Sequence, residues 1–147
     1  MKTKTQKKNS ICHIDPDGNK FWTNQKGQYH RKDGPAIKWG NGDKEWYIDG
    51  KLHREDGPAV EYVGGRKVWY MSGQRHREDG PAIEYADGCK EWYVKGQLHR
   101  LNGPAVVYAN DSKEWWLNDF CFTKKEYWLK LYKRKLITKK ELFLKLL

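Results

Sequence analysis

The sequence has few of the features that mark a membrane, secreted or disulfide-bonded protein. It contains no run of about 18 apolar residues, so no transmembrane helix is expected. Residues 1–10 are basic and polar, and no apolar stretch follows them, so we expect no secretory signal. The three cysteines, at positions 12, 89 and 121, fit neither a disulfide framework nor a paired metal motif. We therefore expect free thiols, a cytoplasmic location, and neither metal nor cofactor.

Basic charge is also missing from the middle of the chain, although the whole sequence carries a net charge of +10. Residues 1–8 contribute +4, and residues 123–147 contribute +7 from nine basic and two acidic residues. Residues 9–122 hold 16 basic and 17 acidic residues, a net charge of −1. The basic character therefore belongs to the two ends, and the body of the chain is neutral.

What the sequence does contain is a repeat with a period of 23 residues. Gly-Pro steps begin at positions 34, 57, 80 and 103, and His-Arg steps begin at positions 30, 53, 76 and 99. Tryptophan recurs at positions 46, 69, 92 and 115, and Trp22 precedes this series by 24 residues because the turn at 23–27 is longer. A fixed period over four copies predicts tandem structural units, each in contact with its neighbours.

Each unit is expected to form two short antiparallel strands. Residues 44–48 and 59–62 are aromatic and β-branched, and Asp49-Gly50 is a hairpin-turn dipeptide. Strand alternation suggests that the Trp row and the Val/Tyr row are buried in one core. A propeller blade needs about 40–45 residues, so the chain is too short to close a propeller. We predict a mainly β protein: an open, elongated array of hairpin repeats over 11–122, after a basic, flexible segment 1–10.

Residues 123–147 form a basic amphipathic helical segment by sequence. Thr123 with Glu126 and Thr138 with Glu141 are capping boxes that each open an apolar-periodic run. One interpretation is a helical cap over the last edge of the array. The other is a helix that binds an anionic membrane surface, a nucleic acid or a partner groove. Both hold if the first helix caps the array and the second projects from it.

At this point the repeat resembles a known family. The pattern Trp46-x-x-x-Gly50-Lys51-x-His53, followed by Gly, Tyr and Asp-Gly, is similar to the MORN repeat over about residues 13–122. The resemblance implies a hairpin array that serves as a scaffold, a protein-binding surface or a lipid-headgroup contact. Here His-Arg-x-Asp-Gly-Pro-Ala replaces the common His-Gly-x-Gly, so no binding residue is carried over. This variant resembles repeats of phage and large-virus proteins, which implies a host-interaction protein acting inside an infected cell.

The His-Arg-x-Asp motif is interpreted as a structural turn rather than as a catalytic or metal site. It occurs four times at equal spacing, whereas an active site is normally present once. The fourth copy has Asn102 where the second has Asp56, and only Asp is a base or an anionic ligand. Asp and Asn both form side-chain-to-backbone turns, so the exchange preserves a turn. We expect no enzyme; the alternative for this motif is an anion contact through its arginines.

Two sets of residues are candidates for binding. The residue after each repeated tryptophan should face away from the Trp row, and an exposed aromatic row marks a recognition surface, unless the sheet folds over and buries both faces. The predicted function is thus a non-catalytic interaction or scaffold module that binds a protein partner. The alternative is a binder of nucleotide, nucleic acid or anionic lipid. The partner-binding set is Tyr47, Tyr70, Tyr93 and Trp116, and the alternative anion-binding set is Arg31, Arg54, Arg77, Arg100, Lys139 and Lys140.

Overall fold

The computed structural model describes residues 10–147 and is mainly β. The chain forms two compact units, residues 1–74 and 75–147, and each is described by itself. Apart from Ser10, the predicted basic segment 1–10 lies outside the described residues, so its flexibility stays a prediction.

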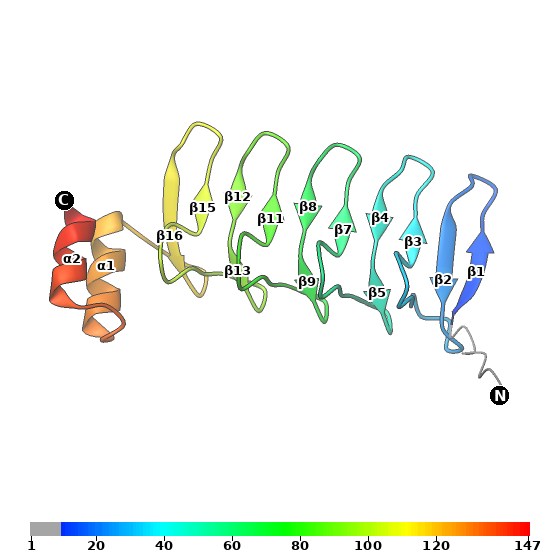
Figure 1. Cartoon of the computed structure of the whole chain (residues 1–147), viewed down its shortest axis with the longest axis horizontal. Helices are drawn as coiled ribbons and strands as arrows, with labels where there is room; N and C mark the ends of the chain where they lie inside the picture. The colour runs from blue at the N-terminus through cyan, green and yellow to red at the C-terminus, as the bar shows by residue number, and fades with distance from the viewer. Residues whose placement is uncertain (1–9) are drawn as a thin grey trace, which may run out of the picture. The chain divides into compact units, whose positions relative to one another are not determined.

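The first unit is a run of antiparallel hairpins (Figure 1). Its main-sheet strands pair in the order β1-β2-β3-β4-β7-β8, and β5 and β6 form a separate two-stranded ribbon. Its strands are β1 (Ile11–Ile14), β2 (Lys20–Thr23), β3 (Ile37–Lys38), β4 (Lys44–Glu45), β5 (Tyr47–Ile48), β6 (Lys51–Leu52), β7 (Val60–Glu61), β8 (Lys67–Val68) and β9 (Tyr70–Met71). The next strand, β10 (Gln74–Arg75), contains the boundary between the units.

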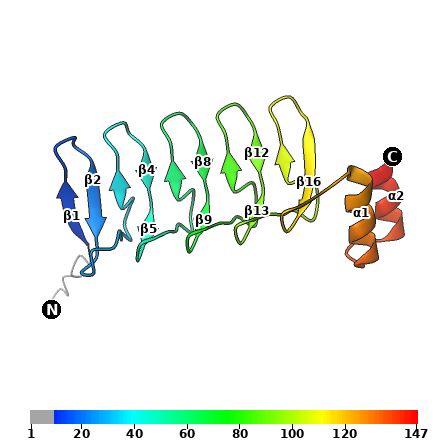
Figure 2. The same ribbon diagram turned by 180° about the vertical axis from the view of Figure 1, so that it is seen from behind.

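The second unit continues the hairpin pattern and ends in two helices, which lie side by side (Figure 2). Its main-sheet strands pair in the order β11-β12-β15-β16-β17, and β13 and β14 form a two-stranded ribbon. Its elements are β11 (Ile83–Glu84), β12 (Lys90–Glu91), β13 (Tyr93–Val94), β14 (Gln97–Leu98), β15 (Val106–Val107), β16 (Lys113–Leu117), β17 (Phe120–Phe122), α1 (Lys124–Lys133) and α2 (Lys139–Leu146). The predicted fold class, an open set of antiparallel hairpin repeats with C-terminal helices, is confirmed.

The small ribbons are closed by two-residue turns. In the β5–β6 ribbon, Asp49 has φ 48° and Gly50 has φ 76°, so both turn residues are left-handed. This is the type I′ turn that suits the twist of a hairpin, and Gly relieves the steric cost at its second position. Asn118 and Asp119 form the corresponding turn in the last repeat, and both are left-handed, with φ 52° and 63°.

The strand register corrects the predicted composition of the core. Val60 lies opposite Glu45, so these two side chains share one face of the sheet. Tyr47 is on that face as well, because its hydroxyl donates to Glu45. Trp46 is on the other face, because Arg54, which stacks on its ring, binds Glu61, the neighbour of Val60. The buried Val60 therefore lies on the same face as Tyr47, whereas Tyr62 of the same row is 40% exposed. The prediction that the Val/Tyr row shares one core with the Trp row is wrong.

Helix α1 caps the last repeat. Tyr127, Trp128 and Leu131 are buried and pack with Leu117 of β16. The Tyr127 hydroxyl also donates to the backbone carbonyl of Arg100. Burial of such side chains contributes about 2 kcal/mol each, so this contact stabilises the end of the sheet strongly. The first of the two interpretations of the tail thus holds for α1.

The predicted capping boxes are present in both helices, but their packing differs. Thr123 and Glu126 cap α1, and Thr138 and Glu141 cap α2. Among the residues that the structure describes, none in α2 is buried. The second helix is therefore formed and capped but contributes little to the core.

The difference between the helices predicts different costs of truncation. Leu131→Ala removes a fully buried side chain and should lower the free energy of unfolding by about 2–5 kcal/mol. Phe143→Ala in α2 removes a side chain that is 65% exposed and should change it by less than about 0.5 kcal/mol. Urea denaturation of both variants measures this. Equal effects would show that α1 does not act as the cap.

Candidate functional site

Each repeated arginine is bound within its own repeat, as Arg54 shows. Its guanidinium lies over the Trp46 ring, with Cζ 4.0 Å from the ring centroid. Its Nε donates to Asp56 Oδ1 at 2.8 Å. Its Nη1 donates to the Pro58 carbonyl at 3.2 Å and to Glu61 Oε1 at 2.9 Å. Stacking and charge-assisted hydrogen bonds together fix the side chain, which is 21% exposed.

The other predicted anion-binding arginines make the same kinds of contact. In the fourth repeat Arg100 Nε donates to the amide oxygen of Asn102 at 2.9 Å. An uncharged acceptor therefore takes the place that an aspartate has in the other repeats. This favours a structural role for the arginine row. The matching contacts are Arg31 over Trp22 at 4.1 Å, Arg100 over Trp92 at 3.9 Å, Arg77 to Asp79 at 2.8 Å and Arg77 to Glu84 at 2.9 Å.

The glycine of each Gly-Pro step makes room for the guanidinium. A Cβ added to Gly57 would lie 3.0 Å from Arg54 Cζ, and one added to Gly80 would lie 2.8 Å from Arg77 Cζ. The first distance is tighter than nine in ten real Cβ contacts, and the second is shorter than real Cβ atoms show. The glycine therefore lets the guanidinium keep its position, and a Cβ there would make the arginine shift.

Each repeated histidine fixes the turn of the following repeat. His53 Nδ1 accepts the backbone N–H of Ser72 at 3.1 Å, and His76 Nδ1 accepts that of Lys95 at 3.2 Å. The acceptor lies 19 residues before the donor in both cases. His30 and His99 accept in the same way from Asp49 and Asn118, each at 3.2 Å.

The predicted aromatic binding row is less exposed than expected. Tyr93 is buried at 9% exposure, and Tyr47, Tyr70 and Trp116 are half-buried. Of the two alternatives, burial holds for Tyr93, whereas Tyr47, Tyr70 and Trp116 are partly exposed, and a role of this row in partner binding stays a prediction.

Glutamates bind the polar atoms of this row. The Tyr47 and Tyr93 hydroxyls donate to Glu45 and Glu91, each at 2.9 Å, and the Trp116 indole donates to Glu114 at 2.8 Å. Burial, reinforced by Glu91, raises the pKa of Tyr93 to about 12. Tyr47 shows the same effect: burial and then Glu45 raise its pKa far above the usual range. These hydroxyls therefore stay protonated and serve as donors.

A groove of about 970 Å³ lies in the first unit, and charged and apolar side chains converge on it. It lies beside the long turn at residues 24–28 and the turn at Asp49. Three cations line it, together with one carboxylate, two histidines and two isoleucines. These residues are Lys26, Lys32, Lys51, Asp49, His30, His53, Ile11 and Ile48.

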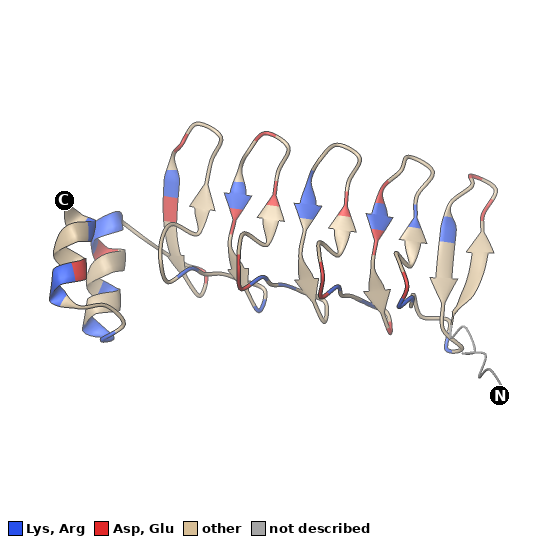
Figure 3. Cartoon of the chain, in the orientation of Figure 1, with Lys and Arg blue, Asp and Glu red and all other residues tan. Residues whose placement is uncertain are grey.

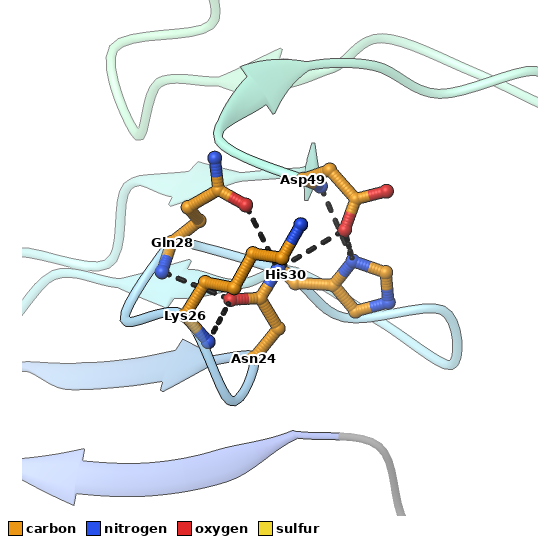
Figure 4. Close-up of polar contacts among 5 residues, drawn as sticks. All are labelled: Asn24, Lys26, Gln28, His30 and Asp49. Atoms are coloured by element: carbon orange, nitrogen blue, oxygen red, sulfur yellow. Dashed lines mark hydrogen bonds and ion pairs between the residues drawn. The ribbon is translucent and has the colours of Figure 1, made fainter.

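Asn24 organises one wall of the groove (Figure 4). Its Oδ1 accepts the backbone N–H groups of Lys26 at 3.0 Å and Gln28 at 3.1 Å, which closes the long turn. Its Nδ2 donates to Asp49 Oδ1 at 3.1 Å and so ties this turn to the next repeat. His30, 7% exposed, contacts the same carboxylate oxygen at 2.8 Å.

The groove is positively charged. The hydrogen bond from Asn24 lowers the pKa of Asp49, and contacts with His30 and the charge of Lys26 lower it further. Asp49 is therefore ionised at neutral pH and is the one carboxylate among the described lining residues, against three lysines. The arrangement can bind an anionic group and offers apolar contact from Ile11 and Ile48 beside it.

Sequence reasoning did not predict this groove, although one signal was present. The interval between Trp22 and Trp46 is 24 residues instead of 23, and the additional residue lies in the turn at 23–27. A single longer turn in an otherwise regular array indicates that the surface at this turn differs from the surface at the matching turns of the other repeats. The other predicted cations, Lys139 and Lys140, lie exposed in α2 of the second unit.

No protein-family model and no curated protein matches the chain. The similarity to the MORN repeat therefore stays a prediction. Within residues 10–147, no three His, Cys, Asp or Glu side chains lie together in a way that could hold a metal ion. No helix in this part of the chain is long and apolar enough to cross a membrane.

The arginine contacts predict a non-additive pair of substitutions. Arg54→Lys loses the planar stacking and the two-sided hydrogen bonding, and should lower the free energy of unfolding by about 1–3 kcal/mol. Gly57→Ala should also destabilise the protein, but much less in the Arg54→Lys background, because the guanidinium no longer fills the space. A double-mutant cycle in urea measures this coupling. Full additivity would contradict the close-approach explanation; Arg134→Lys, at an exposed position, is the control.

The histidine contacts predict equal roles in different repeats. His53→Ala and His76→Ala should each lower the free energy of unfolding, by about 1 kcal/mol, since each removes one acceptor from a turn N–H. His53→Asn should retain part of that stability, because its Oδ1 offers an acceptor near the position of Nδ1. Thermal melting of the three variants compares them. A loss confined to one histidine would point to a special function at that position.

Proposed function

We propose that this protein is a non-catalytic interaction module that holds an acidic segment of a partner protein in the groove of its first unit. The observation that carries the proposal is the convergence of Lys26, Lys32 and Lys51 on one concave surface of a body that is neutral as a whole. Complementary charge of this kind favours an acidic partner and speeds its association.

Hydrogen bonds within the protein hold the walls of the groove in place without a partner. Gly50 N–H donates to the Tyr29 carbonyl at 2.9 Å, and Gly73 N–H donates to the Leu52 carbonyl at 2.8 Å. The bonds from His30, His53 and Asn24 add to this ladder. A preformed site loses little conformational entropy on binding, which increases the affinity that a few charges can supply.

The chemistry of the lining favours a peptide over nucleic acid. Ile11, 57% exposed, and Ile48 give apolar contact beside the lysines, and Asp49 would repel a continuous phosphate backbone. The arginine row is not used in this proposal, because its guanidinium groups already bind acceptors within their repeats. The similarity to repeats of phage and large-virus proteins extends the proposal to a host protein as the partner, met in the cytoplasm.

A labelled hexaglutamate peptide tests the proposal, with hexaglutamine as the neutral control. Replacing Lys26, Lys32 and Lys51 by Gln should weaken hexaglutamate binding about tenfold, at roughly 0.5 kcal/mol per lysine. Fluorescence anisotropy at low salt measures the affinity.

A second triple variant controls for total charge. Lys67, Lys90 and Lys113 are exposed strand lysines outside the groove lining, and changing them to Gln removes the same charge. This variant should bind hexaglutamate within about twofold of the unchanged protein. Equal loss in both triple variants, or absence of binding by the unchanged protein, would contradict a site in the groove.

A further inference from the structure

Helix α2 presents an uncovered apolar surface. Phe143 is 65% exposed, Leu144 is 59% exposed and Leu147 is 83% exposed. The helix is attached to the cap through its other side, where Leu142 packs with the cluster around Trp128. Large apolar side chains grouped in this way mark an interaction surface.

Basic residues surround this apolar surface. Residues 123–147 carry nine lysines and arginines against two glutamates, and Figure 3 shows blue segments on both helices. Lys139 and Lys140 precede Phe143 and Leu144 by one helical turn, so they lie on the same side of α2. A binding partner of α2 must therefore offer both an apolar environment and negative charge to one short helix.

Charge and polarity distinguish three candidate partners of α2: a second copy of this chain, a nucleic acid and an anionic membrane. A second copy of this chain would bring together two segments that each carry a net charge of +7, which repel one another. A nucleic acid would neutralise the lysines but offers little apolar environment for leucine and phenylalanine. The interface of an anionic membrane supplies both, because acyl chains lie directly beneath negatively charged headgroups.

We propose that α2 docks on an anionic lipid surface. Phe143, Leu144 and Leu147 enter the boundary between headgroups and acyl chains, and Lys139 and Lys140 contact the lipid phosphates. The helix is formed in advance, since the Thr138 hydroxyl accepts the Glu141 N–H at 3.2 Å and Glu141 accepts the Thr138 N–H at 2.7 Å. Binding therefore does not require α2 to fold on the membrane.

Vesicle co-sedimentation of the full chain tests this proposal. The protein should bind vesicles of phosphatidylcholine with 30% phosphatidylglycerol and bind pure phosphatidylcholine at least about tenfold more weakly. The double variant Phe143→Ser/Leu144→Ser should bind the anionic vesicles about tenfold or more weakly than the unchanged protein. Its melting temperature should not change, because both side chains are exposed.

Two control variants separate this surface from general stickiness and charge. Val63→Ser/Leu101→Ser removes two exposed apolar side chains from the repeats, which are 72% and 47% exposed, and should leave vesicle binding intact. Lys139→Gln/Lys140→Gln should weaken binding to anionic vesicles, whereas Lys67→Gln/Lys90→Gln, at exposed strand positions of the repeats, should not.

Three results would overturn the proposal. The first is absence of binding to the anionic vesicles. The second is binding by Phe143→Ser/Leu144→Ser equal to that of the unchanged protein, which would mean adhesion by charge alone. The third is a dimer in light scattering that this variant abolishes, which would assign the surface to a second copy of the chain.

Discussion

A guanidinium held between a tryptophan ring and a glycine is the contact around which each repeat is built. In the second repeat Arg54 stacks on Trp46, and Gly57 leaves the space for it on the other side. Its hydrogen bonds to Asp56 and the Pro58 carbonyl then fix the loop that covers the small, fully buried Ala59. Removing Asp56 would leave the guanidinium without one of its charge-assisted hydrogen bonds.

The histidine that precedes each of these arginines connects its repeat to the next one by a hydrogen bond. Its Nδ1 fixes a turn 19 residues ahead, so one repeat holds the turn of the next. Glutamates also connect consecutive repeats: Glu91 accepts from the hydroxyl of Tyr85 in the repeat before it and from that of Tyr93 in its own. The histidines, arginines and carboxylates of the repeated motif thus form contacts that hold the fold together.

Binding is therefore expected where the regular pattern is interrupted. The long turn closed by Asn24 departs from the period, and there lysines converge on a groove. Helix α2 departs from it as well, and there apolar side chains remain uncovered. Both surfaces are basic while the body of the chain is neutral, so both proposals require anionic partners but of different kinds: an acidic peptide in the groove and a lipid surface on the helix.

The sequence alone determined the period, the hairpin turns and the helix starts, because these depend on local geometry. Asp49-Gly50 and Thr123 with Glu126 specify their structures within a few residues. Local geometry did not reveal which rows of side chains share a face of the sheet. Nor did it reveal that Tyr93 is buried or that the arginines bind acceptors within their own repeats. These features depend on strand register and on contacts between residues far apart in sequence. Only the tertiary structure decided them, because a shift of one residue in register exchanges the two faces of a strand.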